Sequence, residues 1–321
     1  MGYMHKIQQW LKSVGYGDWR VEVASQDASF RSYYRIFKEK QTYVVMDSSL
    51  LLESLPPFIE LNETLKSVDV CVPSIIVKDI ELGYLILEDF GNTHYLESLT
   101  NENYQTLYKK AIDEIIKIQK ADTKGLPHYD KAFLSFEMAL MEEWYIEKYL
   151  NISLNDEQKH RVDTTLNTIT KEVLQQPQEV FVHRDFHSRN IMLTPKHHIG
   201  IIDFQDARVG AITYDLVSLL KDCYIEWDKK EVETLALYYR NSVGLEVDDS
   251  TFIRWFDFMG LQRHIKVLGI FARLYLRDGK EGYLKDIPLT LKYVIETASK
   301  YPETEKLAHM LKEITKDKEN I

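Results

Sequence analysis

The feature that most constrains this chain is a pair of short polar segments set between apolar strands near its middle. Residues 183–190 read His-Arg-Asp-Phe-His-Ser-Arg-Asn, and residues 203–206 read Asp-Phe-Gln-Asp. Apolar residues lead into the first segment at 181–182, leave it at 191–193 and run into the second at 199–202. Short apolar runs bounded by polar residues predict strands. The expected order is therefore strand, loop, hairpin and acidic turn.

This order contains the parts that phosphoryl transfer requires. The reaction needs a hydroxyl aimed at the γ-phosphate and metal ions that neutralise phosphate charge. Asp185 is the candidate general base, and Asn190 and Asp203 are the candidate Mg²⁺ ligands. A single His-Arg-Asp arises by chance, and an Asp after a strand often caps a turn. The combination of Asp, Asn, hairpin and Ile-Asp-Phe in one order favours the catalytic interpretation.

Composition excludes several classes of protein. The 321 residues are enough for two lobes with their own cores, and 45% hydrophobic with 28% charged residues is typical of a soluble globular protein. No apolar run approaches the ~20 residues of a membrane helix, and the N-terminus lacks a secretion signal, so we expect a cytoplasmic location and no membrane partner. The net charge of −10 argues against nucleic acid as a partner and leaves a small-molecule substrate.

The distribution of patterns along the chain predicts an α+β fold with two lobes. Residues 1–90 are rich in short strands, with a helix expected over 55–68, and would form a small nucleotide-binding lobe. Residues 91–321 would form a larger, mostly helical lobe for catalysis and substrate binding, with a long helix expected over 133–150. We expect ATP in a cleft between the lobes.

The adenine of that ATP is expected beside the segment that follows Leu87. Glu88 and Phe90 lie there, at the predicted junction of the two lobes. Residues at the end of a strand have backbone groups that are not used by the sheet. Glu88 and Phe90 are therefore candidate nucleotide-binding residues.

These segments resemble a known superfamily. Residues 25–35, 87–91, 183–190 and 202–204 are similar to the aminoglycoside phosphotransferases and choline kinases, which share the protein-kinase-like fold. A closer resemblance is to bacterial kinases that phosphorylate the anomeric hydroxyl of N-acetylmuramate and N-acetylglucosamine, and it is carried by residues 27–35, 45–47, 87–91, 183–192, 202–224 and 260–273.

The resemblance implies an ATP- and Mg²⁺-dependent kinase acting in the recycling of cell-wall sugars. It also implies that Asp215 supports the catalytic loop. Two alternatives stay open: a kinase for a cationic alcohol such as choline or an aminoglycoside, and a nucleotide-binding module without catalysis.

The chain departs from the family pattern where the phosphates should bind. The loop after the first strand contains no glycine, so Ser25, Ser29 and backbone N–H groups would have to contact the phosphates. Met46 stands where the family has a phosphate-binding lysine. Arg31 and Arg35 are the candidate replacements, and the alternative is that both are surface residues on an exposed strand.

Basic residues near the catalytic segments have two interpretations each. Arg189 could place a positive charge near the transferring phosphoryl group, or it could pair with a nearby acid. Arg263 and Lys266 share one face of a predicted helix with spacing i and i+3. They could bind a carboxylate of the acceptor, or they could form a solvated basic patch.

Overall fold

The computed structural model describes residues 2–26, 31–195 and 199–316, with the backbone alone described at 2, 3, 25 and 26. The chain divides into two compact units, of which unit 1 combines Met1–His94 with Ile191–Gln205, and unit 2 combines Tyr95–Asn190 with Asp206–Ile321. The boundary expected near residue 90 did not include the return of 191–205 to unit 1. Backbone hydrogen bonds from Leu193 N to Thr93 O and from Ile201 N to Cys71 O make that connection.

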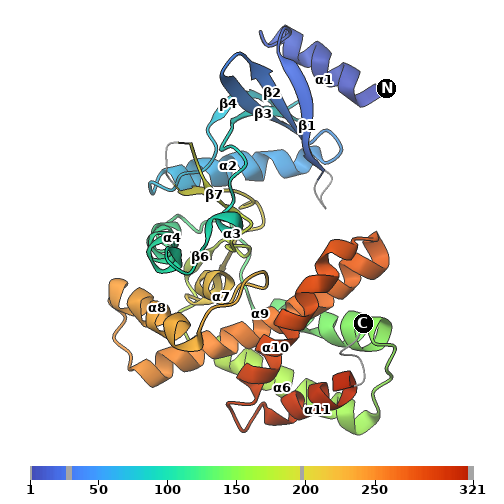
Figure 1. The fold of residues 1–321 in the computed structure, drawn as a ribbon, viewed down its shortest axis with the longest axis vertical. Helices are drawn as coiled ribbons and strands as arrows, with labels where there is room; N and C mark the ends of the chain where they lie inside the picture. The colour runs from blue at the N-terminus through green and yellow to red at the C-terminus, as the bar shows by residue number, and fades with distance from the viewer. Residues whose placement is uncertain (1, 27–30, 196–198, 317–321) are drawn as a thin grey trace. The chain divides into compact units, whose positions relative to one another are not determined.

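Unit 1 is built on a five-stranded antiparallel sheet with the strand order β1-β2-β3-β5-β4 (Figure 1). A two-stranded hairpin, β7-β8, is a second small sheet of this unit. Its elements are α1 (Gly2–Ser13), β1 (Arg20–Gln26), β2 (Ser32–Lys38), β3 (Gln41–Asp47), η1 (Leu52–Ser54), α2 (Leu55–Lys66), β4 (Ile75–Asp79), β5 (Tyr84–Glu88), β7 (Ile191–Leu193) and β8 (Ile199–Ile201).

Helix α1 covers one face of the sheet and forms a core with it. Ile7 and Trp10 of α1 pack with Ile36, Val45 and Ile86, which come from three neighbouring strands, and all five are almost completely buried. Successive side chains of a strand point to opposite faces. The residues that flank this core in β2 and β3 therefore point away from α1.

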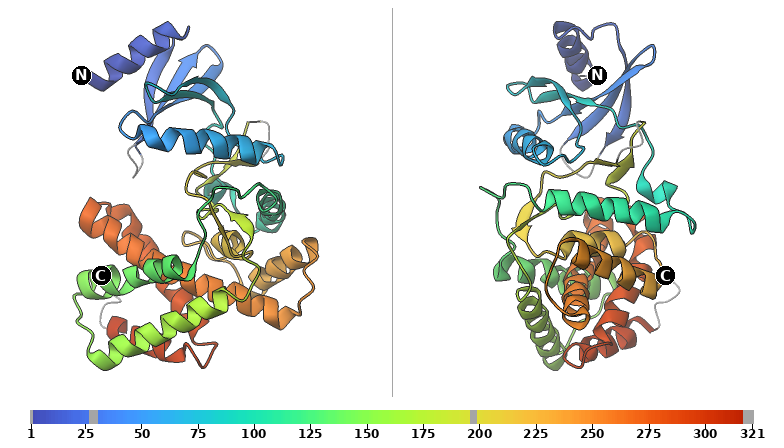
Figure 2. Two further views of the ribbon diagram at one scale, coloured as in Figure 1. Left: turned by 180° about the vertical axis from the view of Figure 1, so that it is seen from behind. Right: turned by 90° about the vertical axis from the view of Figure 1, so that its left-hand side faces the viewer.

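Unit 2 is mostly helical (Figure 2). Two short strands, β6 and β9, pair antiparallel within it. Its elements are α3 (Tyr95–Ser98), α4 (Tyr104–Ile118), α5 (Lys131–Leu140), η2 (Met141–Tyr149), α6 (Asp156–Val173), β6 (Val180–Val182), β9 (Arg208–Gly210), α7 (Tyr214–Leu220), α8 (Lys229–Ser242), α9 (Asp249–Asp278), η3 (Glu281–Asp286), α10 (Ile287–Ala298) and α11 (Glu305–Thr315).

Helix α9 is the centre of unit 2. It is 30 residues long and contacts α5, α6, α7, α10 and η2. Residues 256–269 of this helix are buried without interruption. A helix that is buried on every side belongs to the core of a protein. The polar residues of this stretch therefore need partners inside the protein.

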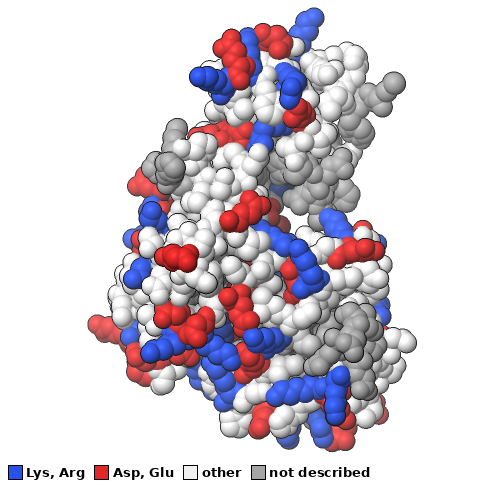
Figure 3. All heavy atoms as spheres, viewed as in Figure 1, with Lys and Arg blue, Asp and Glu red and all other residues white. Residues whose placement is uncertain are grey.

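The expected α+β fold with a small sheet and a mostly helical remainder is confirmed. The helix expected over 133–150 is observed as α5, which ends at Leu140, and a π-helical segment, η2, that continues directly to Tyr149. Among the residues that the structure describes, no helix has both the length and the apolar character needed to cross a membrane. On the face drawn in Figure 3, acidic and basic side chains are interspersed.

Helix α9 approaches the backbone at the end of α5 closely, and this contact can be tested. A Cβ atom at Gly269 of α9 would lie 2.3 Å from the carbonyl carbon of Leu140 and 2.5 Å from its oxygen. Gly269→Ala should therefore lower the free energy of unfolding by about 1–3 kcal/mol, because a backbone group must move. Urea denaturation measures the loss.

Gly260 provides the control in the same helix. The nearest atom to a Cβ there is Lys221 Cδ at 3.7 Å, which is ordinary contact. Gly260→Ala should be neutral or stabilising by up to about 1 kcal/mol, because alanine is the better helix former. Equal stability of the two variants would contradict the close approach of α9 to Leu140.

Candidate active site

The segment 183–190 forms a loop that leaves β6 and is anchored by buried carboxylates. Asp215, in the first turn of α7, accepts hydrogen bonds from His183 N at 2.7 Å and from Arg184 N at 3.0 Å. Asp222 accepts one from Ser188 N at 2.9 Å. Burial raises the pKa of Asp215 to about 6 against the lowering effect of these donors, so it is ionised near neutral pH. The supporting role expected for Asp215 agrees with these contacts.

Asp185 and Asn190 lie together in this loop. The Asn190 side-chain amide donates from Nδ2 to the backbone oxygen of Asp185 at 3.0 Å, and His187 N donates to the same oxygen at 3.0 Å. Asn190 N in turn donates to His187 O at 2.9 Å. These bonds set the course of the loop from Asp185 to Asn190 and orient the Asn190 amide.

The Asp185 carboxyl is ionised at neutral pH. Burial by itself would raise its pKa, but interactions with Lys266, His187, Arg184 and Arg263 outweigh burial and hold the pKa below its usual value. Burial also lowers the pKa of His187 to about 4, so that imidazole is neutral near pH 7. A carboxylate in this state can accept a proton from a hydroxyl that is placed against it.

Arg184 precedes Asp185 in an unusual backbone conformation. Its φ is +78°, in the left-handed region that costs a residue other than glycine of order 1–3 kcal/mol. Such a conformation persists where surrounding contacts impose it. The Arg184 side chain has those contacts: Nη2 lies 2.8 Å from Glu137 Oε1, Nε donates to Tyr129 OH at 3.1 Å, and Nη1 donates to Asp206 O at 3.3 Å.

Arg189 forms the ion pair that was one of its two expected roles. Its Nη2 lies 3.5 Å from Asp286 Oδ2, and its guanidinium lies 3.5 Å from the centre of the Tyr224 ring. Tyr224 also meets the His187 ring edge to face at 5.2 Å. Asp286 and Tyr224 have no distinguishing sequence signal, and only folding identifies them as neighbours of the loop. A direct role of Arg189 in catalysis stays a prediction.

Asp203 belongs to unit 1, where it follows β8. Its backbone φ is +65°, and its Oδ1 accepts a hydrogen bond from Gln205 Nε2 at 2.5 Å. The next residue, Phe204, is buried and stacks on Phe58 of α2 with 5.0 Å between ring centres. The stacked Phe204 fixes the chain immediately after Asp203. Its role as a metal ligand stays a prediction.

Arg35 is tied to the segment that follows β5, where Glu88 and Phe90 lie. Its guanidinium pairs with Asp89 at 2.7 Å and also donates to Gly91 O at 3.0 Å. Phe90 is buried against Gly200 of β8, where a Cβ would come within 2.5 Å of the Phe90 ring. The structure thus brings Arg35 and the 88–91 segment together within unit 1. Contact of any of them with a nucleotide stays a prediction.

The remaining candidates for phosphate binding have different outcomes. Arg31 is 6% exposed, donates to Ser54 O at 3.2 Å and lies over the Phe58 ring, so the alternative of a surface arginine is wrong for it. Met46 of β3 is completely buried. Ser25 lies in β1 with only its backbone described, and Ser29 lies outside the described residues.

The basic residues of α9 are not a solvated patch. Arg263, His264 and Lys266 are buried, with exposed fractions of 4%, 0% and 5%. Lys266 Nζ lies 3.0 Å from Glu137 Oε1, and His264 Nε2 donates to Lys221 O at 2.8 Å. The solvated-patch interpretation failed because helical spacing identifies a shared face but not the helices that cover it.

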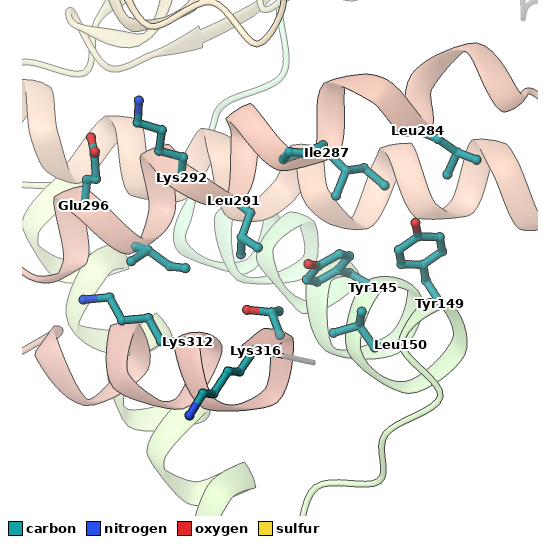
Figure 4. Close-up of a pocket in the computed structure, with 13 residues that line it drawn as sticks. Tyr145, Tyr149, Leu150, Leu284, Ile287, Leu291, Lys292, Glu296, Lys312 and Lys316 are labelled. Atoms are coloured by element: carbon teal, nitrogen blue, oxygen red, sulfur yellow. The ribbon is translucent and has the colours of Figure 1, made fainter. Parts of the chain in front are cut away.

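A separate hollow of about 740 Å³ lies between α10, α11 and η2 (Figure 4). Ile287 and Leu291 of α10 and Tyr145 of η2 form apolar parts of its wall. Lys312 of α11 and Lys316, which follows the end of α11, also line it. No residue of the 183–190 loop is among the described residues that line it. The candidate catalytic residues are therefore not part of this hollow.

The fold of this chain is similar to the folds of solved small-molecule kinases and phosphotransferases. The choline kinase LicA from Streptococcus pneumoniae has a TM-score of 0.65 at 16% identity, covering 92% of this chain and 100% of its own. An ADP-bound aminoglycoside phosphotransferase has a TM-score of 0.62 at 16% identity, with 92% and 99% covered. This likeness shows the shared protein-kinase-like fold.

Residues 20–254 match the phosphotransferase enzyme family, and the chain belongs to that family. The N-acetylmuramate/N-acetylglucosamine kinase of Neisseria meningitidis serogroup B is 39% identical, over 98% of this chain and 96% of its own length. The kinase of the same name from Pseudomonas aeruginosa is 39% identical, over 90% of this chain and 86% of its own. The expected family is confirmed, and the chain is a phosphotransferase.

Proposed function

We propose that this chain is an ATP- and Mg²⁺-dependent kinase that phosphorylates the anomeric hydroxyl of N-acetylmuramate or N-acetylglucosamine. The observation that carries the proposal is the similarity to kinases of that name along almost the entire chain. Similarity of 39% that extends through both units includes the catalytic loop and the helices of unit 2. These are the parts that would meet the acceptor.

In this proposal Asp185 is the general base. Its carboxylate is ionised because Lys266, Arg184 and Arg263 lie near it, and the loop that carries it is held by Asp215 and Asn190. Phosphoryl transfer depends mainly on positioning and charge stabilisation. Asp185 would orient the sugar hydroxyl and accept its proton, while Arg189 would add positive charge near the transferring group.

The proposed metal ligands have the chemistry that Mg²⁺ prefers. Asn190 donates through Nδ2 to Asp185 O, and this bond orients the side-chain amide. The proposed ligand atom, Asn190 Oδ1, belongs to the same amide. Asp203 contributes a carboxylate. Mg²⁺ is usually held by one or two protein oxygens together with water and phosphate oxygens, and a bound ion would neutralise charge on the ATP phosphates.

The proposal assigns nucleotide contacts to residues of unit 1. Backbone groups at Glu88 and Phe90 would meet the base, and Arg35 would shape this segment through its bonds to Asp89 and Gly91. With Met46 in β3, the phosphates need another cation, and Arg31 or Arg35 would supply it. Ser25 and Ser29 complete the expected phosphate contacts.

The product identifies the acceptor atom. With ATP and Mg²⁺, either amino sugar should give a 1-phosphate, visible by NMR as phosphorus coupling to the anomeric proton. The methyl glycoside of N-acetylglucosamine, in which the anomeric oxygen is blocked, is the matched control and should not react. A 6-phosphate, turnover of the methyl glycoside, or reaction with choline or an aminoglycoside and with neither sugar would overturn the proposal.

A further inference from the structure

A buried carboxylate on α5 lies at the centre of a polar network behind the catalytic loop. Glu137 is 3% exposed, and its neighbours on the same helix, Leu134 and Met138, are apolar core residues. A buried charge is costly unless it is paired and hydrogen-bonded. The Glu137 carboxylate therefore needs polar and charged partners inside the protein.

Glu137 has four polar partners from three segments of unit 2. Its oxygens lie 2.8 Å from Arg184 Nη2 and 3.0 Å from Lys266 Nζ, accept from Tyr129 OH at 3.0 and 3.1 Å, and accept from Gln262 Nε2 at 3.2 Å. Two cations thus share one carboxylate. Both are among the charges that act on Asp185.

Glu137 and Tyr129 both hold the guanidinium of Arg184. Tyr129 OH accepts from Arg184 Nε at 3.1 Å while donating toward Glu137, so Glu137, Tyr129 and Arg184 form a closed triangle. Arg184 has a φ of +78° and is followed directly by Asp185. A turn of the Arg184 backbone into an ordinary conformation would redirect Asp185, and the clamp on its side chain opposes that turn.

We propose that Glu137 is a positioning residue of the reaction, which acts by clamping Arg184 so that the next residue, Asp185, keeps its direction. This rests on the proposed role of Asp185 as the base. Glu137 touches no reacting atom in this scheme. It also holds Lys266 in place beside the loop, so that one carboxylate organises both the backbone and the local charge.

The first test separates positioning from folding by comparing two buried carboxylates. Asp257 of α9 is the matched control: it is 1% exposed and pairs with Lys221 at 2.7 Å and Lys300 at 3.0 Å, none of which belongs to the 183–190 loop. Glu137→Gln and Asp257→Asn each remove one buried charge and keep the shape of the side chain. Both should lower the melting temperature.

The two variants should differ in catalysis. Glu137→Gln should lower kcat by about 10²-fold with KM for ATP and sugar kept within about threefold, because a misplacement of about 1 Å costs that much in rate. Asp257→Asn should keep kcat within about threefold of the wild-type value. Equal effects on kcat, or an unchanged kcat in Glu137→Gln, would overturn the inference.

Hydrogen exchange provides a readout that does not depend on the acceptor. Amides of 183–190 should exchange faster in Glu137→Gln and stay protected in Asp257→Asn. Unchanged protection in a folded Glu137→Gln would refute the clamp, whereas wild-type protein that turns over no sugar would refute the proposed function instead. Should Glu137→Gln fail to fold, Tyr129→Phe removes the shared hydroxyl and keeps the ring, and the same loss of kcat and protection is expected.

Discussion

Asp185→Asn should lower kcat by about 10²–10⁴-fold, the usual contribution of a positioned general base. The substitution keeps the size of the side chain and removes the group that accepts the proton of the acceptor. Because the bonds that hold the loop use the backbone oxygen of Asp185, the loop should keep its course and ATP should bind as before. Steady-state rates with N-acetylglucosamine, together with calorimetric titration of ATP, measure both quantities.

The control for this substitution is another Asp-to-Asn change. Asp228 caps α8 by accepting from Lys230 N and Glu231 N, and asparagine is an equally good cap. Asp228→Asn should leave kcat unchanged. Near-normal turnover in Asp185→Asn would remove this residue from the role of base.

The pKa of Asp185 adds a second observable. Because nearby positive charges lower it below the usual value of about 3.9, the carboxylate stays ionised throughout the range from about pH 5 to 8. The wild-type profile of kcat/KM should therefore show no decline from protonation of this group over that range. A decline in the wild type centred near pH 6 that is absent from Asp185→Asn would contradict the lowered pKa.

Asp203→Ala should abolish measurable turnover, with a loss greater than about 10³-fold, because metal-ion stabilisation of the phosphates is worth several kcal/mol and each 1.4 kcal/mol is a factor of ten. It should also weaken ATP binding in the presence of Mg²⁺. Without Mg²⁺ the substitution should instead strengthen ATP binding, because removal of a negative charge relieves repulsion of the triphosphate. Calorimetric titration with and without Mg²⁺ distinguishes the two cases.

Asp206→Ala is the companion variant for Asp203. Asp206 is exposed, and its backbone oxygen, which the substitution keeps, accepts from Arg184 Nη1. It should retain most of the turnover and the Mg²⁺ dependence of ATP binding. Wild-type activity and Mg²⁺ dependence in Asp203→Ala would place the metal site elsewhere. If turnover is lost in Asp206→Ala and retained in Asp203→Ala, Asp206 is the metal ligand in place of Asp203.

Much of the fold follows from local pattern. The helix expected over 55–68 is observed at Leu55–Lys66, and the hairpin after the 183–190 loop is observed as β7 and β8. Such elements are predictable because apolar spacing and the residues that end a segment act within a few residues of one another. The change from α- to π-helix after Leu140 was not predicted. It lies where the backbone of α5 meets Gly269, more than a hundred residues away.

The candidate site divides in the same way. The order of Asp185, Asn190 and Asp203 was readable because all three lie in one stretch whose spacing reflects a single loop and hairpin. Glu137 and Tyr129 were not readable, since a lone Glu in an amphipathic helix resembles any solvated one. Their significance depends on α5 and α9 being packed together, which brings Glu137 to Lys266 at 3.0 Å.

The sequence by itself determined the family, the order of the elements and the residues proposed for chemistry, because those depend on side chains close together along the chain. Only the tertiary structure decided which charges are buried and which residues hold the 183–190 loop. Arg263 and Lys266 share a face wherever this segment is helical. That face is buried because other helices surround α9 on all sides. A buried cation is costly unless a carboxylate pairs with it. The carboxylate that pairs with Lys266 is that of Glu137, and only folding brings these two residues together.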